Sequence, residues 1–155
     1  MKFIISILVL FVVSISAHAE QAKPFDLATL DGQINLKELK GKVVYLDFWA
    51  SWCTPCRKSF PWMNKMQTRY QDKGLEIIGV SLDSKRKHTE AFLKKIPAQF
   101  TIALDPKGEV ADTYHVQVMP TSFLIGRDGQ VLWDHKGFRD SAADKLEQAI
   151  AEALK

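Results

Sequence analysis

The hydrophobic and polar positions of the chain change their spacing several times, and each spacing predicts one kind of element. A nearly continuous apolar run over residues 43–49, rich in β-branched and aromatic side chains, predicts a central strand with both faces covered. Residues 56–70 carry apolar side chains at spacings of three and four, which predicts an amphipathic helix. Shorter patterns predict strands over 25–27, 34–36, 76–82, 100–104, 122–125 and 131–133, and helices over 89–96, 109–114 and 142–154.

Strands and helices alternate through the middle of the chain, and this order predicts an α/β fold. Right-handed βαβ crossovers make such a sheet mainly parallel. The dipeptide Asp31-Gly32 separates the first two strands and Asp128-Gly129 separates the last two, and each predicts a tight antiparallel turn. We therefore expect a central mixed sheet flanked by helices, with a short N-terminal hairpin.

The N-terminus has the pattern of a secretory signal peptide. Lys2 precedes an apolar run from Phe3 to Ile15, and small residues follow at Ala17 and Ala19. The run is shorter than the roughly 20 residues that span a bilayer, so we expect cleavage after Ala19, with an uncleaved anchor as the alternative. The prediction is an exported, periplasmic protein, with a signal peptide over residues 1–19 and one domain over residues 20–155.

Length, composition and charge fit one packed domain. The chain has 155 residues, of which 46% are apolar, and about 150 residues is a usual domain size. Its 21 basic and 18 acidic side chains give a net charge of only +3. These charges are spread along the chain and do not form the basic stripe that binding to phosphates requires, so nucleic acid is not an expected partner.

The two cysteines of the chain carry its clearest chemical signal. Cys53 and Cys56 are separated by two residues and follow the predicted central strand, a spacing typical of a redox-active dithiol. At the start of a helix, Cys53 would face free N–H groups and the positive end of the helix dipole, which favours its thiolate. Pro55 suits an early helical position because it has no N–H to leave unpaired. We expect a redox-active disulfide of Cys53 and Cys56 and no further cofactor.

Other uses of the cysteine pair fit the sequence less well. A structural zinc site usually needs four ligands, and the chain after residue 19 adds only three scattered histidines to the two cysteines, so no metal site is expected. Haem attachment would require histidine directly after Cys56, where Arg57 stands. A structural disulfide over so small a loop would restrain the unfolded chain little. The alternative function is a copper-binding or chaperone-like module with both sulfurs as ligands. Peroxidase activity is a third and less favoured hypothesis.

The segment Asp47–Arg57, DFWASWCTPCR, resembles the active-site segment of thioredoxins. Pro61 stands five residues after the second cysteine, where the thioredoxin helix has its kinking proline, and Val118–Thr121 resembles the thioredoxin proline loop. An additional helix and strand between residues 83 and 105, together with the signal peptide, is similar to the exported TlpA/ResA branch of thiol-disulfide oxidoreductases. The likeness covers about residues 24–154 and implies a thioredoxin-like fold with a helix–strand insertion.

This resemblance also implies an activity and its partners. Cys53 would be the nucleophile that attacks a disulfide of an exported protein, and Cys56 the resolving cysteine that completes the exchange. Relatives in this branch suggest a reductant that acts on apocytochrome c or another exported thiol protein. A membrane electron donor would then reduce the pair again.

Substrate contacts are expected on both sides of the dithiol. The resemblance implies a cis bond between Met119 and Pro120 that faces the cysteines and exposes a backbone edge to an extended segment of the target. Trp52 offers a large rigid ring next to Cys53, and Met119 is either an apolar contact or a soft copper ligand. The expected substrate-binding residues are Trp52, Thr54, Pro55, Met119 and Pro120.

Asp47 is the candidate proton acceptor. Thioredoxins have a buried aspartate at this position, where burial raises its pKa and equips it to take a proton from Cys56. Proteins of the TlpA/ResA branch commonly have asparagine there, and a glutamate where this chain has Ser59. The lysine that accompanies the aspartate in thioredoxins is Gly79 here. A solvated aspartate at the strand end is the alternative reading.

Overall fold

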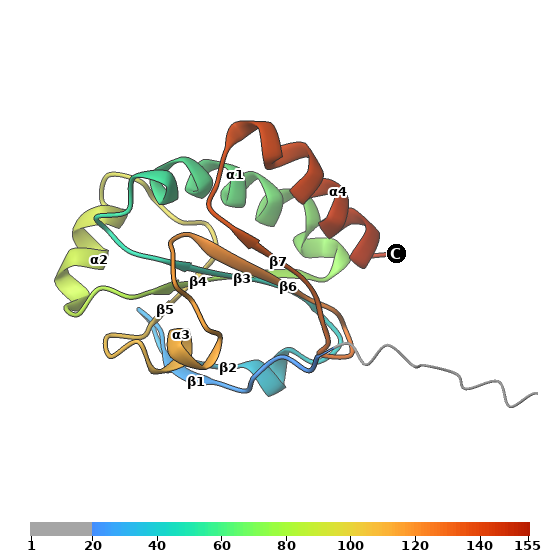
Figure 1. Cartoon of the computed structure of the whole chain (residues 1–155), viewed down its shortest axis with the longest axis horizontal. Helices are drawn as coiled ribbons and strands as arrows, with labels where there is room; N and C mark the ends of the chain where they lie inside the picture. Colours follow the sequence, from blue (N-terminus) through green and yellow to red (C-terminus); the bar gives the residue numbers. More distant parts are fainter. Residues whose placement is uncertain (1–19) are drawn as a thin grey trace, which may run out of the picture.

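A five-stranded mixed sheet with the order β5–β4–β3–β6–β7 lies at the centre of the molecule (Figure 1), in a computed structural model that describes residues 20–155. β3 runs parallel to β4, and β4 parallel to β5, whereas β6 is antiparallel to both β3 and β7. The strands are β3 (Val43–Trp49), β4 (Leu75–Ser81), β5 (Thr101–Leu104), β6 (Thr121–Ile125) and β7 (Val131–Lys136). The mixed sheet is confirmed; the predicted signal peptide lies outside the described residues.

β3 is central because its side chains are apolar on both faces, and all seven of its residues are buried. Val43, Tyr45 and Trp49 pack in one hydrophobic cluster with residues of the first helix. Val44, Leu46 and Phe48 pack in a second cluster on the opposite face. Because successive side chains of a strand alternate between faces, Asp47 lies on the same face as Tyr45 and Trp49.

Helices cover both faces of this sheet. α1 (Thr54–Tyr70) and α4 (Ala143–Ala153) lie together on one face, and α3 (Glu109–Thr113) lies on the other face with the hairpin of β1 (Asp26–Ala28) and β2 (Gln33–Asn35) (Figure 1). α2 (Arg86–Leu93) follows β4 and contributes Phe92 to the cluster beneath α1. The 3-10 helices are η1 (Leu36–Leu39), η2 (Gln71–Lys73) and η3 (Asp140–Ala142).

Every predicted strand and helix is present, and the differences are at the ends. α1 begins at Thr54 rather than residue 56, because Cys53 caps the helix. α2 begins at Arg86 rather than residue 89, with an ion pair of 2.7 Å between Arg86 and Glu90 on successive turns. β7 continues to Lys136, three residues beyond the predicted strand. The N-terminal hairpin forms a two-stranded sheet of its own.

Candidate active site

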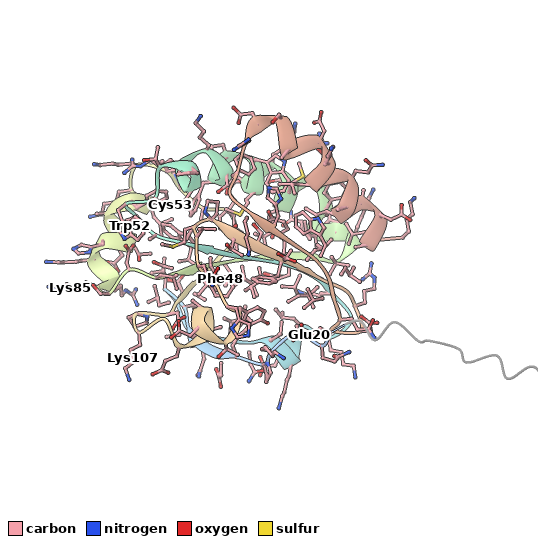
Figure 2. All side chains as sticks on the ribbon, viewed as in Figure 1. Glu20, Phe48, Trp52, Cys53, Lys85 and Lys107 are labelled. Carbon is pink, nitrogen blue, oxygen red and sulfur yellow. A yellow bond between two sulfur atoms is a disulfide. The ribbon has the colours of Figure 1, made fainter. Side chains whose placement is uncertain are left out.

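Cys53 and Cys56 form a disulfide at the start of α1, with a distance of 2.07 Å between their sulfurs. β3 ends at Trp49, and a short turn carries the chain to Cys53, whose sulfur caps the helix by accepting a hydrogen bond from the N–H of Cys56 at 3.3 Å. Cys53 is 4% exposed and Cys56 is fully buried. An incoming sulfur therefore reaches Cys53 first, at the end of the molecule where Figure 2 labels Trp52 and Cys53.

The residues around Cys53 present a partly apolar surface. Trp52 is 70% exposed, and Thr54 and Pro55 are exposed as well. They flank the nearly buried Cys53 in the sequence and present exposed side chains beside it. These are three of the five residues expected from the sequence to contact substrate.

The loop before β6 comes to the same end of the sheet. Thr121 pairs with Phe48 near the end of β3, and Met119 packs against the cluster that contains both cysteines. The bond between Met119 and Pro120 is cis. Met119 is half-buried and Pro120 is buried, so of these two expected contacts Met119 offers more accessible surface.

Hydrogen bonds leave one part of this loop free. The carbonyl of Pro120 accepts from the N–H of Gly137 at 2.7 Å, and the carbonyl of Val118 accepts from the hydroxyl of Thr121 at 2.7 Å. Within residues 20–155, the main chain of Met119 forms no hydrogen bond with another backbone group. Its N–H and carbonyl are among the main-chain groups of the loop that could pair with another chain.

Asp83 anchors the turn before Cys53, and the sequence reasoning missed it. The N–H of Ser51 donates to both oxygens of this buried carboxylate, at 3.2 and 3.3 Å, and the Ser51 hydroxyl donates to Oδ1 at 2.8 Å. From α2, the Thr89 hydroxyl donates to Oδ2 at 3.0 Å. A usable sequence signal was present, because Asp83 follows β4, whose carboxyl end lies beside that of its parallel neighbour β3.

Asp47 is 1% exposed, so it is not a solvated strand-end residue. The hydroxyl of Ser122, opposite on β6, donates to Oδ1 at 2.7 Å, whereas Oδ2 is buried and has no hydrogen-bond partner among residues 20–155. Burial raises the pKa of Asp47 to about 7, and the hydrogen bond from Ser122 opposes this rise. A carboxyl with a pKa near neutrality exchanges a proton readily at physiological pH.

β4 places no basic side chain opposite Asp47 that could balance the negative charge of its carboxylate. Gly79 is its partner there, and a Cβ added to Gly79 would lie 2.9 Å from the ring of Phe100 and 3.1 Å from Nε1 of Trp49. A lysine at this position has no room. Ser59, where related proteins were expected to have glutamate, is buried and donates its hydroxyl to the carbonyl of Cys56 at 3.0 Å.

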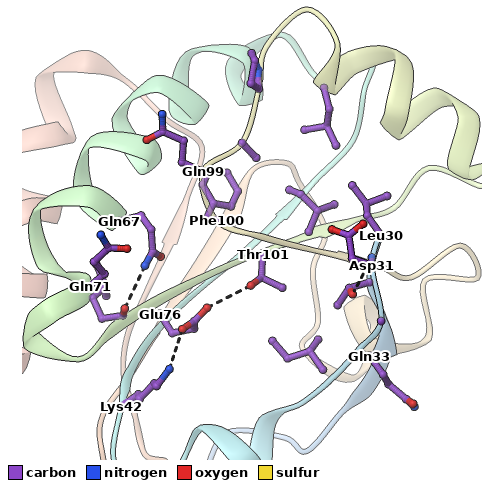
Figure 3. A pocket seen from close by; sticks show the side chains of 18 of the residues that line it. Leu30, Asp31, Gln33, Lys42, Gln67, Gln71, Glu76, Gln99, Phe100 and Thr101 are labelled. Carbon is purple, nitrogen blue, oxygen red and sulfur yellow. Dashed lines mark hydrogen bonds and ion pairs between the residues drawn. The ribbon is translucent and has the colours of Figure 1, made fainter.

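A separate polar hollow of about 1040 Å³ lies between the N-terminal hairpin, the end of α1 and β5 (Figure 3). Several of its polar groups already bind one another. Glu76 accepts from Lys42 at 3.0 Å and from Thr101 at 3.2 Å, and Gln67 accepts from the N–H of Ile77 at 2.8 Å. The hollow adjoins the beginnings of β3 and β4, whereas the dithiol follows the end of β3, so it is not part of the dithiol site.

Residues 20–155 contain neither a membrane-spanning helix nor a cluster of metal ligands. No helix in this range is long and apolar enough to cross a membrane. No three His, Cys, Asp or Glu side chains of the same range gather closely enough to hold a metal ion.

Comparison with known proteins identifies the family of this dithiol fold. The sequence pattern of the AhpC/TSA family matches residues 19–133. The chain belongs to the AhpC/TSA family. It is 40% identical over 132 residues to the thiol-disulfide oxidoreductase ResA of Bacillus thuringiensis subsp. konkukian, a match that covers 84% of this chain and 75% of that relative. With ResA of Bacillus subtilis it shares 36% identity over 117 residues, or 75% of this chain and 65% of the relative.

Solved structures agree with these sequence matches. A structure described as thiol:disulfide interchange protein DsbE from Chlorobium tepidum superposes with a TM-score of 0.87 at 50% identity, covering 88% of this chain and 97% of that one. A protein disulfide isomerase structure from Bacteroides thetaiotaomicron gives a TM-score of 0.81 at 30% identity, covering 90% and 91%. The thioredoxin-like fold and the resemblance to ResA are confirmed, and the chain is a thiol-disulfide oxidoreductase of this family.

The raised pKa of the buried Asp47 carboxyl predicts that the free energy of unfolding depends on pH. The pKa of Asp47 in the folded state, about 7, lies above the ordinary aspartate value of 3.8. Between these two pH values the folded state therefore holds a proton that the unfolded state has lost. The free energy of unfolding of the wild type should therefore fall as pH rises from about 4 to about 7 and then level off. Three pKa units correspond to a total of about 4 kcal/mol.

Asp47→Asn should remove this loss of stability. The variant should become progressively more stable than the wild type between pH 4 and pH 7, as measured by urea unfolding of the oxidised proteins. Asp72→Asn, at an exposed position of η2, controls for the loss of one carboxylate. Parallel stability curves for the wild type and Asp47→Asn would contradict the assigned titration.

Proposed function

We propose that this protein is an exported reductant of protein disulfides, with Cys53 as the nucleophile and Cys56 as the resolving cysteine. The observation that carries the proposal is the disulfide at the start of α1, where one sulfur caps the helix and the other is fully buried behind it. After reduction, the free N–H groups of the first turn would stabilise a thiolate on Cys53.

The reaction is a two-step exchange of disulfides. The Cys53 thiolate attacks one sulfur of the target disulfide, so that a mixed disulfide forms and the other target sulfur leaves as a thiolate. Cys56 then loses its proton to Asp47 and attacks the Cys53 sulfur. The mixed disulfide breaks, the bond between Cys53 and Cys56 forms, and the second target thiolate leaves. The target gains two electrons, and the dithiol loses two.

The target would bind as an extended segment along the loop before β6. The free N–H and carbonyl of Met119 offer main-chain hydrogen bonds, which give affinity without demanding a particular target sequence. Trp52, Thr54 and Pro55 would contact the segment from the other side of Cys53. This arrangement suits a reductant that acts on several unfolded or extended targets.

Direction and location are supported by the relatives and by the N-terminal sequence. The named ResA and DsbE relatives, together with the signal peptide pattern of residues 1–19, favour an exported protein in the periplasm. Apocytochrome c and other exported thiol proteins are the proposed targets, and a membrane electron donor is the proposed source of electrons. The redox-active disulfide needs no further cofactor.

Trapping tests the proposed roles of the cysteines. Cys56→Ala should accumulate a covalent complex with a target protein in the native envelope, because nothing displaces the target from Cys53. Cys53→Ala should trap nothing. Complexes are resolved by non-reducing electrophoresis and should disappear with dithiothreitol. Equal trapping by both variants would contradict the assignment of the nucleophile.

Asp47→Asn should slow the second step of the exchange and leave the first step nearly unchanged. General base catalysis typically contributes about 100-fold or more, so resolution of the mixed disulfide at pH 7 should fall by about that factor. Stopped-flow release of nitrothiobenzoate from the aromatic disulfide dithiobis(nitrobenzoate) separates the steps, since attack by Cys53 releases the first thiolate and resolution by Cys56 the second. If the wild type and Asp47→Asn released the second nitrothiobenzoate at equal rates, Asp47 would have no part in resolution.

The reduction potential tests the proposed direction. Proteins of this chemistry span about −270 mV for reductants to about −120 mV for strong oxidants. A reductant role predicts a potential near the lower of these values, measured by equilibrating the protein with dithiol and disulfide forms of dithiothreitol. A potential near the upper value would reverse the direction and make the protein an oxidase.

A further inference from the structure

A chain of hydrogen bonds behind the dithiol ends on the proposed proton acceptor. The hydroxyl of Tyr45 donates to Oγ of Ser122 at 2.9 Å, and Oγ of Ser122 donates to Oδ1 of Asp47 at 2.7 Å. The three residues are between 1% and 3% exposed. Tyr45 and Asp47 come from one face of β3, and Ser122 reaches the same face from β6, where it pairs with Asp47.

The direction of these bonds decides which oxygen of Asp47 can carry a proton. A serine hydroxyl has one hydrogen to donate. Since Ser122 accepts from Tyr45, its own hydrogen points to Oδ1 of Asp47, and that oxygen remains an acceptor. Burial and the neighbouring Asp47 raise the pKa of Tyr45, so Tyr45 keeps its proton and stays a donor. A proton taken up by Asp47 must therefore reside on Oδ2.

Oδ2 is the atom left free to do this. It is buried and has no hydrogen-bond partner within the described residues, on the face of the sheet that α1 and the dithiol cover. An unpartnered buried oxygen is costly. A carboxylate that served only to hold the fold together would be expected to have both oxygens paired, as Asp83 does.

We infer that Ser122, oriented by Tyr45, is a positioning residue that fixes the Asp47 carboxyl so that Oδ2 receives the proton of the resolving thiol. The inference deepens the proposed function and rests on it. The proton transfer breaks the S–H bond of Cys56 and forms an O–H bond on Oδ2, while the sulfur keeps the electron pair with which it attacks Cys53.

The chain of hydroxyls holds the carboxyl and does not conduct its proton to water. It ends at Tyr45, whose ring lies between Trp62, with ring centres 5.5 Å apart, and Trp133, with ring centres 6.5 Å apart. The neighbours of Asp47 in the sheet are Gly79 on β4 and Ser122 on β6, and Tyr45 lies two residues before it on the same face of β3. Both cysteines pack with Tyr45 in the hydrophobic cluster on this face. One strand further from Asp47, the half-exposed His135 on β7 pairs with Ser122.

The test compares Ser122→Ala with Ser122→Thr, which keeps a hydroxyl, and with Tyr45→Phe, which removes only the phenol oxygen. The pKa of Asp47 is measured from its carboxyl carbon by NMR on reduced protein with labelled aspartate, using Asp47→Asn to assign the signal. The rate of resolution is measured from pH 5 to pH 9 as the second release of nitrothiobenzoate.

Loss of the Ser122 hydroxyl should raise both the pKa of Asp47 and the pH of half-maximal resolution. Hydrogen bonds to charged groups are strong enough that Ser122→Ala should raise the pKa of Asp47 by about one unit. The pH of half-maximal resolution should rise by the same amount, because the base accepts a proton only when it is ionised. Ser122→Thr should match the wild type, and Tyr45→Phe should give a smaller shift in the same direction.

Two outcomes would overturn the inference, and they remain distinct from failure of the proposed function. An unchanged pKa of Asp47 in Ser122→Ala would show that Ser122 does not hold the carboxyl. A raised pKa with an unmoved pH profile of resolution would show that the held carboxyl does not receive the proton. In either case the trapping experiment still reports independently whether Cys53 and Cys56 carry out the exchange.

Discussion

The burial of the Asp47 carboxyl on the face of the sheet that α1 covers is the constraint on which the proposed chemistry of this protein depends. Asp47 interrupts an otherwise apolar strand at the point where that strand is covered by the helix that begins at the dithiol. Burial penalises the charged form of the carboxyl and brings its affinity for a proton close to that of the surrounding solution at neutrality. The fold thus keeps a carboxyl that can gain or lose a proton near neutrality almost fully out of contact with solvent.

The remaining parts of the site follow from how three strand ends meet. The carboxyl end of β3 leads into the cysteine turn, the carboxyl end of β4 leads to Asp83, and the loop before β6 arrives from the opposite direction. Because these ends share one edge of the sheet, the dithiol, the Asp83 carboxylate and the loop before β6 come together without any long loop.

Much of this arrangement could be predicted from the sequence, for identifiable reasons. The bounds of β3 were predicted without error because its run of apolar residues is broken only by Asp47. The start of α1 was placed two residues too late, because a cysteine is not an ordinary helix cap and its role depends on the folded position of its sulfur. Burial of Asp47 was expected, and the glycine opposite it was identified correctly.

The contacts between distant segments could not be predicted in the same way. Ser122 meets Asp47 only through the register of β3 and β6, which no local pattern in the chain specifies. The contact of Asp83 with Ser51, 32 positions away, is different: it was missed, although the expected parallel pairing of β3 and β4 brings the two turns together. Hydrogen-bonding side chains of this kind look like ordinary surface residues until the strands are paired.

The shared carboxylate of Asp83 ties the inserted segment to the reactive turn. Both oxygens accept from the N–H of Ser51 beside the dithiol, and Oδ2 also accepts from the hydroxyl of Thr89 on α2. Local opening of α2 would take a hydrogen-bond donor from this carboxylate and loosen the turn that carries Cys53, so the two should open and close as one cooperative unit. The inserted helix is accordingly joined through Asp83 to the turn that carries Cys53.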